Sequence, residues 1–327
     1  MRIGRNFTNM LETEYLTEEE RKALKEGKLE VSDMDAMVQS KSKRDIIHQI
    51  DVINEIGLNH IELDGGIPNP FLKMSDEEIE KIRDYARKKE TTISLHLPYT
   101  FVAESVATFQ EEDRVLACGL LKRYIDFARK IGAIAVNMHP GSIPFYQAVG
   151  KYLEIVKQSL EKSLQELCEY STSKNITFHV ENNTAFDFIG VENEELIEII
   201  SNVRKKGFDV KYCFDIGHWF TRGLPQFGKQ IPSPPESVVN EIPDEMLYEV
   251  HLNDFLIEGD KFEFHPPLHR QKGFLKKENL KNLARIFKEK GVEIVVVETA
   301  VRGIDDLLGS RKLLEEESSY LAEVFNV

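Results

Sequence analysis

Six residues of the kinds that bind metal ions lie at the ends of short apolar segments. In order along the chain they are His96, His139, Glu181, Asp215, His251 and Glu298. Segments such as 93–97 (Ile-Ser-Leu-His-Leu) and 294–298 (Ile-Val-Val-Val-Glu) are typical of buried strands. Buried carboxylates need a cation nearby, and few Lys or Arg residues lie at these ends. We therefore expect a divalent metal, for which imidazole and carboxylate groups are ordinary ligands.

Two more histidines extend this set. His218 follows Asp215 by three residues in Asp-Ile-Gly-His, and His269 lies in the loop after the seventh strand segment. Any one histidine alone is more simply explained as a hydrogen-bonded structural residue. Because the pattern recurs at six strand ends, a metal site is favoured over a structural polar network.

Alternating helix and strand patterns must position these residues. Periodicity and capping signals predict helices at about 44–57, 76–89, 111–131, 146–173, 193–206, 277–290 and 305–324. Apolar segments predict eight strands, at 2–7, 60–63, 93–97, 135–139, 177–181, 212–215, 249–251 and 294–298. Strands that alternate with helices form a parallel sheet, and eight of them can close a barrel. The C-terminal ends of barrel strands converge on one face, where the six residues would meet.

The sequence thus predicts an α/β fold, a single TIM (β/α)8 barrel domain over residues 1–327. Two insertions interrupt the repeat, a highly charged one at about 12–43 and a Pro-rich one at about 221–246. The alternative is an open doubly wound sheet, which typically carries a Gly-rich phosphate turn after its first strand. The sequence contains no such turn, and this favours the barrel.

Composition restricts the classes of partner. The chain has a net charge of −14, which disfavours nucleic acid but leaves a local basic groove open. No segment reaches 18 consecutive apolar residues, so we expect no membrane span, and the N-terminus lacks a signal-peptide pattern. Three scattered cysteines, Cys118, Cys168 and Cys213, indicate a reducing cytoplasm. The oligomeric state stays open, a homo-oligomer included.

Three other features are expected to lie outside the site. His265 is expected to be exposed in a Pro-rich loop, although it could serve as a spare ligand. His179 lies two residues before Glu181 on the same side of a strand, where it could support that glutamate. The Glu-rich segment 314–319 is expected to be a solvated helix face.

Six short phrases carry a resemblance to a known superfamily. In order along the chain they are Leu95–Tyr99, His139–Ser142, Val180–Thr184, Asp215–His218, His251–Asp254 and Val297–Thr299. The sequence from about 93 to 300 resembles the xylose isomerase-like TIM barrels. That superfamily includes endonuclease IV and many sugar isomerases and epimerases, and the resemblance implies a barrel with a metal site.

The resemblance to endonuclease IV implies a trinuclear zinc site. Its ligands would be His96, His139, Glu181, Asp215, His218, His251, His269 and Glu298. That family also needs an Asp two residues before the last histidine, where this chain has Pro267. We therefore expect one or two divalent ions (Zn, Mn or Co), bridged by Glu181. His96 and His139 would bind one ion, and Asp215, His251 and Glu298 the other.

The resemblance to the ketose epimerases implies a smaller ligand set that is complete here, Glu181, Asp215, His251 and Glu298. In that family one metal chelates adjacent sugar oxygens, and the two glutamates act as acid and base on opposite faces of the substrate. The metal would stabilise the enediolate as the proton leaves.

The same resemblance suggests substrate contacts. His218 would bond a substrate oxygen, and Arg270 and Lys272 could hold hydroxyl or phosphate oxygens. Trp219 could wall the pocket or pack in the core. We expect a metal-dependent sugar or sugar-phosphate isomerase or epimerase. The alternative, favoured by the surplus His96 and His139, is an endonuclease IV-like phosphodiesterase at abasic DNA sites. A metal-binding barrel without catalysis is a third interpretation.

Overall fold

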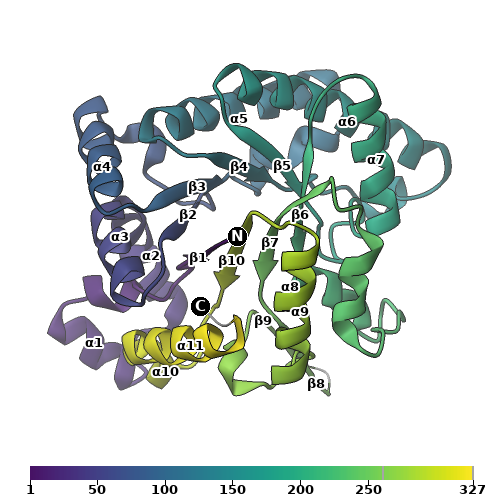
Figure 1. Cartoon of the computed structure of the whole chain (residues 1–327). Coiled ribbons are helices and arrows are strands. Elements are labelled where there is room, and N and C mark those ends of the chain that lie inside the picture. The colour runs from purple at the N-terminus through teal and green to yellow at the C-terminus, as the bar shows by residue number, and fades with distance from the viewer. Residues whose placement is uncertain (260, 326–327) are drawn as a thin grey trace.

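Eight parallel strands close into a barrel in the computed structural model, which describes residues 1–259 and 261–325 (Figure 1). Around the barrel the strand order is β1-β10-β7-β6-β5-β4-β3-β2. The strands are β1 (Arg2–Asn6), β2 (His60–Asp64), β3 (Thr92–His96), β4 (Ala135–Met138), β5 (Thr177–Glu181), β6 (Lys211–Asp215), β7 (Leu247–Leu252) and β10 (Ile294–Glu298). The predicted TIM barrel is confirmed.

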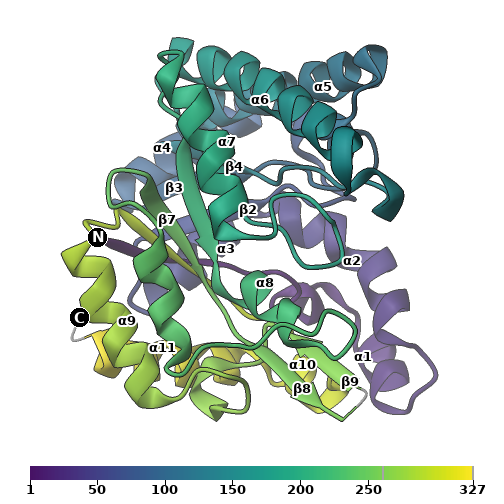
Figure 2. The ribbon, with the colours of Figure 1, turned by 90° about the vertical axis from the view of Figure 1, so that its right-hand side faces the viewer.

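Helices cover the outside of the barrel (Figures 1 and 2). They are α1 (Glu18–Lys25), α2 (Val31–Arg44), α3 (Ile46–Glu55), α4 (Asp76–Lys88), α5 (Glu111–Ile131), α6 (Gly150–Ser173), α7 (Asn193–Lys205), α8 (Ile216–Phe220), α9 (Lys277–Glu289), α10 (Ile304–Leu308) and α11 (Ser310–Phe325). Local chemistry sets their limits: the Ser75 side chain caps α4, and Gly132 ends α5 in the left-handed region. Among the described residues no helix is both long and apolar enough to cross a membrane.

The strand register aligns the polar strand ends. In β6 and β7 Asp215 pairs with His251, and in β1 and β10 Asn6 pairs with Glu298. Because paired residues lie level across a sheet, these side chains reach the same end of the barrel. The interior of β10 is apolar, and all five residues of this strand are buried.

Several predicted elements differ from the structure in detail. The insertion at residues 12–43, for which no elements were predicted, contains a 3-10 helix (Glu12–Tyr15), α1 and most of α2. The predicted helix 146–173 begins later, at Gly150, and the predicted helix 305–324 is divided at Gly309 into α10 and α11. The Pro-rich segment 221–246 contains two short 3-10 helices. A hairpin of β8 (Phe255–Glu258) and β9 (Lys261–Phe264) after β7 was not predicted.

The expectation of a solvated face at 314–319 is wrong at Glu317. This side chain on α11 is fully buried and forms an ion pair of 2.6 Å with buried Arg5 of β1. It also accepts hydrogen bonds from the Thr299 hydroxyl and the Leu268 N–H. The neighbouring Glu316 is exposed as expected, so only part of the segment faces the barrel.

Candidate metal centre

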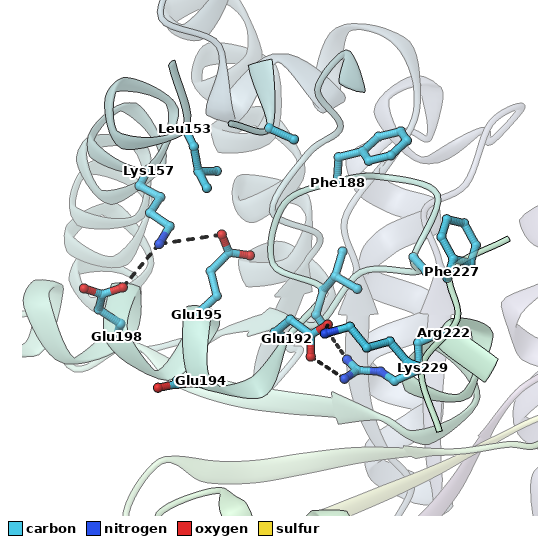
Figure 3. A pocket seen from close by; sticks show the side chains of 13 residues that line it. Leu153, Lys157, Phe188, Glu192, Glu194, Glu195, Glu198, Arg222, Phe227 and Lys229 are labelled. Carbon is cyan, nitrogen blue, oxygen red and sulfur yellow. Dashed lines mark hydrogen bonds and ion pairs between the residues drawn. The ribbon is translucent and has the colours of Figure 1, made fainter. Parts of the chain in front are cut away.

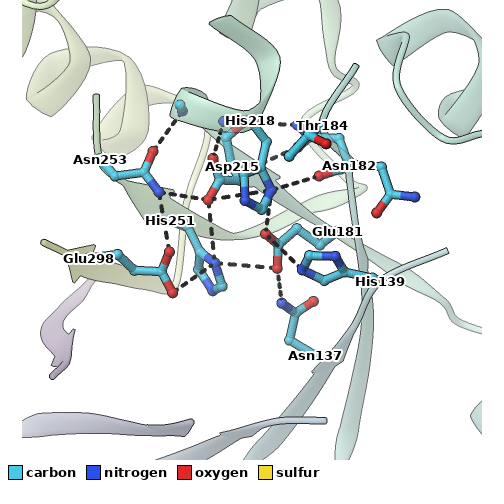
Figure 4. A network of polar contacts seen from close by, with 12 residues as sticks. Asn137, His139, Glu181, Asn182, Thr184, Asp215, His218, His251, Asn253 and Glu298 are labelled. Atoms are coloured by element: carbon cyan, nitrogen blue, oxygen red, sulfur yellow. Dashed lines mark hydrogen bonds and ion pairs between the residues drawn. The ribbon is translucent and has the colours of Figure 1, made fainter. Parts of the chain in front are cut away.

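Glu181, at the end of β5, is the centre of the cluster of histidines (Figure 4). Its carboxylate is buried and lies near four imidazole nitrogens. These are His218 Nδ1 at 3.1 Å, His96 Nε2 at 3.2 Å, His251 Nδ1 at 3.3 Å and His139 Nε2 at 3.5 Å. Asn137 of β4 donates a further hydrogen bond to Oε2 of Glu181. Residues from several strand ends therefore meet at one carboxylate.

His251 connects Glu181 to two more carboxylates. Its Nδ1 lies 3.5 Å from Oε1 of Glu298 and 3.8 Å from Oδ2 of Asp215. The Asn253 amide donates to Oδ2 of Asp215 at 2.7 Å and to Oε2 of Glu298 at 3.2 Å. Asp215 also caps α8 by accepting from the His218 N–H, so the helix fixes the position of His218.

The carboxylates of this cluster are balanced by protons and not by basic side chains. Within the described residues no Lys or Arg forms an ion pair with Glu181, Asp215 or Glu298. Burial, reinforced by Asp215 and Glu181, raises the pKa of Glu298 to about 8. Burial opposes protonation of His96, but Glu181 raises the pKa of that histidine to about 9. Protons thus balance the carboxylates, a role that a divalent ion fills in metal centres.

Several overlapping groups of metal-type ligand atoms occur among the described residues, and two of them contain the residues grouped from the sequence. His96, His139 and Glu181 form one group, in which the ligand atoms all lie within 4.8 Å of one another. Another group with the same spacing consists of Asp215, His251 and Glu298. Oε1 of Glu181 and both ring nitrogens of His251 are buried without a hydrogen-bond partner among the described residues. Buried ligand atoms without a hydrogen-bond partner are consistent with metal binding. The assignment of each residue as a metal ligand stays a prediction.

His265 was expected to be exposed, but it lies in the cavity of the cluster. Its Nδ1 is 3.6 Å from Oε2 of Glu298, and its Nε2 is 3.3 Å from the Asn253 amide. With Asp215 and His218 it forms a third group of metal-type ligand atoms. The hairpin β8–β9 folds His265 back over the barrel, and this hairpin had no strong signal in the sequence.

Glu62 of β2 is a further residue that sequence reasoning missed. It is buried, and its Oε1 lies 3.3 Å from Nε2 of His251. The other ring nitrogen of His251, Nδ1, is the one directed at Glu181. Glu249 of β7 lies 3.5 Å from the same nitrogen and 3.0 Å from His179. His179 is therefore a buried partner of Glu249, two residues along the strand from Glu181. The sequence contained one signal for Glu62, the alternation of side chains between the two faces of the strand segment His60-Ile-Glu-Leu63.

Four predicted site residues neither belong to the cluster nor line its cavity. His269 points toward Glu316 of α11, with Nε2 to Oε2 at 3.9 Å. Both guanidinium NH groups of Arg270 bind Asp306 on α10. Trp219 is 5% exposed and packs under the Arg222 guanidinium, and Lys272, like Trp219, does not line the cavity. The turn after the hairpin directs His269 and Arg270 toward the outer helices, so their predicted contacts stay predictions without support from this geometry.

The cavity of the cluster has a volume of about 290 Å³. Its walls carry carboxylates, imidazoles and amides, and they include Asn6, Glu12, Asp35, Gln39, Asp64, His96, Tyr99, His139, Glu181, His218, His265 and Glu298.

A larger cavity of about 690 Å³ lies between α6, α7 and the loops after β5 and α8 (Figure 3). Most of its charged groups are already paired, Lys157 with Glu195 and Glu198, and Arg222 and Lys229 with Glu192. The smaller cavity is therefore the better candidate for chemistry.

Solved structures similar to this chain have the same fold. A D-tagatose 3-epimerase-like protein shares 22% identity with a TM-score of 0.62, covering 86% of this chain and 96% of its own. D-Psicose 3-epimerase from Clostridium cellulolyticum shares 14% identity with a TM-score of 0.65, covering 86% and 93%. Endonuclease IV from Thermus thermophilus shares 17% identity with a TM-score of 0.61, covering 86% and 96%.

At such low identity these structures establish the fold alone. No curated protein sequence matches this chain. The family model described as xylose isomerase-like TIM barrel matches residues 50–324, which span most of the chain and all the residues of the cluster. The chain therefore belongs to the xylose isomerase-like TIM barrel family.

Proposed function

We propose that the protein is a metal-dependent sugar isomerase or epimerase that moves a proton at the carbon beside a carbonyl group. The observation that carries this proposal is the position of two glutamates around His251. Glu181 and Glu298 approach His251 Nδ1 at 3.3 and 3.5 Å, from opposite sides in Figure 4, and both line the cavity. A substrate in this cavity would have a carboxylate available on each side.

The roles of the individual residues follow from their contacts. Glu181, Asp215, His251 and Glu298 would hold a divalent ion, with Zn, Mn or Co as candidates. When bound, such an ion polarises a carbonyl and stabilises negative charge next to it. One glutamate would remove the proton from carbon and the other would return it. Nδ1 of His218 faces Glu181, which leaves its Nε2 to bond a substrate oxygen.

A second candidate is an endonuclease IV-like phosphodiesterase. The group of His96, His139 and Glu181 favours it, because the isomerase set of Glu181, Asp215, His251 and Glu298 leaves His96 and His139 without a role. The electrostatics of the cavity argue against it. Among the described residues none of the cavity walls is Lys or Arg, whereas DNA backbones are bound mainly by such cations.

Turnover measurements on matched substrates distinguish the two candidates. Protein stripped with a chelator and reloaded with Mn²⁺, Co²⁺ or Zn²⁺ is incubated with a panel of ketoses and with an abasic DNA duplex. We expect conversion of at least one ketose, at least about 100-fold slower in Glu181→Gln and Glu298→Gln. The matched control is Glu316→Gln on the exposed face of α11, which should keep full activity. Chelator-sensitive cleavage of the abasic duplex without conversion of any ketose would establish the second candidate instead.

A further inference from the structure

The insertion between β1 and α3 forms part of the wall of the active-site cavity. Glu12 begins the 3-10 helix that follows β1, and Asp35 and Gln39 lie one turn apart on the same face of α2. All three line the cavity that also contains Glu181 and Glu298. Figure 2 shows α1 and α2 stacked along one side of the barrel. The repeat unit of a TIM barrel does not require these helices, so they are additions placed over the site.

Glu12 is a buried acid in this wall, and its carboxyl group faces that of Asp35. Its side chain is 0% exposed, and apart from the carboxyl of Asp35 its carboxylate oxygens have no hydrogen-bond partner among the described residues. Oδ1 of Asp35 is also buried without a partner. Such groups are costly to bury unless a ligand or water completes their hydrogen bonds. The nearby cation does not relieve Glu12, because Lys43 is paired with Asp64 at 2.8 Å and donates to the Gly66 carbonyl.

The pair of acids holds a proton at neutral pH. Burial first, and then the neighbouring Asp35, raise the pKa of Glu12 to about 9, while Lys43 lowers it only in part. Glu12 is therefore a neutral carboxylic acid that can donate a hydrogen bond, and Asp35 beside it can accept one. A hydroxyl group both donates and accepts, so it complements this pair. A phosphate group would bring negative charge next to Asp35, and no Lys or Arg lines the described walls of the cavity.

We propose that Glu12 and Asp35 form a recognition site for hydroxyl groups of the substrate, which selects uncharged polyol sugars over sugar phosphates. The inference rests on the proposed function and extends it, because it assigns the substrate class to residues of the insertion. Arg270, which was expected to hold hydroxyl or phosphate oxygens, is paired with Asp306 outside the cavity, so it supplies no phosphate contact there.

Binding can be measured without turnover. Isothermal titration of Mn²⁺-loaded protein compares D-fructose and D-tagatose with their 6-phosphates. The wild type should bind the uncharged sugars at least about 10-fold more tightly than the phosphates. Glu12→Leu and Asp35→Leu should each weaken sugar binding about 10-fold. Glu12→Gln retains a donor and an acceptor and should keep near wild-type affinity. The matched control is Glu19→Leu, on the exposed face of α1 in the same insertion.

The outcomes separate this inference from the proposed function. Sugar binding that is unchanged in both Leu variants, or tighter binding of the phosphates, overturns the recognition site and leaves the isomerase proposal intact. Absence of binding by every sugar and sugar phosphate to the wild type overturns both. If Glu12→Leu does not fold, as judged by its circular dichroism, Asp35→Leu decides the question, because Asp35 is only partly buried.

Discussion

Nε2 of His251 lies 3.3 Å from Oε1 of buried Glu62. The other ring nitrogen is directed at Glu181. Neither nitrogen has a hydrogen-bond partner among the described residues, so the contact with Glu62 is electrostatic, and we predict that it orients His251 in a metal-loaded centre. We expect Glu62→Gln to weaken divalent metal affinity by about 10- to 100-fold, because outer partners of metal ligands commonly have effects of this size. Competition with a fluorescent chelator measures the affinity. An affinity equal to that of the wild type would show that Glu249, 3.5 Å from the same nitrogen, is sufficient alone.

The buried ion pair between Arg5 and Glu317 joins α11 to the barrel. Glu317→Ala leaves the Arg5 guanidinium buried without its partner and removes the acceptor of the Leu268 N–H. We expect the free energy of unfolding to fall by about 3–5 kcal/mol. Urea denaturation of the variant and of Glu315→Ala, an exposed neighbour on α11, checks this. A loss below about 1 kcal/mol in the first variant would contradict the role of the pair.

The number of metal ions per chain depends on which groups of ligand atoms the structure brings together. Because Pro267 replaces an expected ligand and His269 points toward Glu316, we expect one or two divalent ions per chain in protein purified without chelators. Elemental analysis with anomalous scattering from crystals counts and locates them. Three fully occupied positions would show that the group of Asp215, His218 and His265 holds an ion. In that case His265→Ala should remove the third ion alone.

In the metal-free protein, the titration of Glu12 makes the free energy of unfolding depend on pH. Its pKa in the folded state is raised from 4.5 to about 9, so the folded state binds more protons than the unfolded state between these two values. The stabilising contribution is therefore present below the unfolded-state pKa and is lost as the pH rises through about 9. Glu12→Gln has no such titration. We expect the stability of the wild type relative to Glu12→Gln to fall from about pH 6 to about pH 9.5, as measured by urea denaturation in chelator. A difference independent of pH would contradict a protonated Glu12.

The fold and the centre of the site were predictable from local signals. Most strand segments carry a polar residue at or next to their C-terminal end, and the barrel brings such ends together, so Glu181, Asp215 and His251 could be assigned to one face. His265 and Glu12 could not be placed, because their positions depend on a short hairpin and on an insertion that folds over the barrel. Likewise Arg270 has the right chemistry for a phosphate contact, but its ion pair with Asp306 arises only in the tertiary structure.

The most direct measurement of the central claim is solvent deuterium exchange followed by proton NMR. A ketose that the metal-loaded protein converts is incubated with it in D₂O. Our account predicts that deuterium replaces hydrogen at the carbon next to the carbonyl. The exchange should stop in Glu181→Gln and Glu298→Gln and continue in Glu316→Gln. Conversion of the ketose without any incorporation of deuterium would mean that hydrogen moves directly between carbons. That result would contradict a proton-transfer role for the two glutamates.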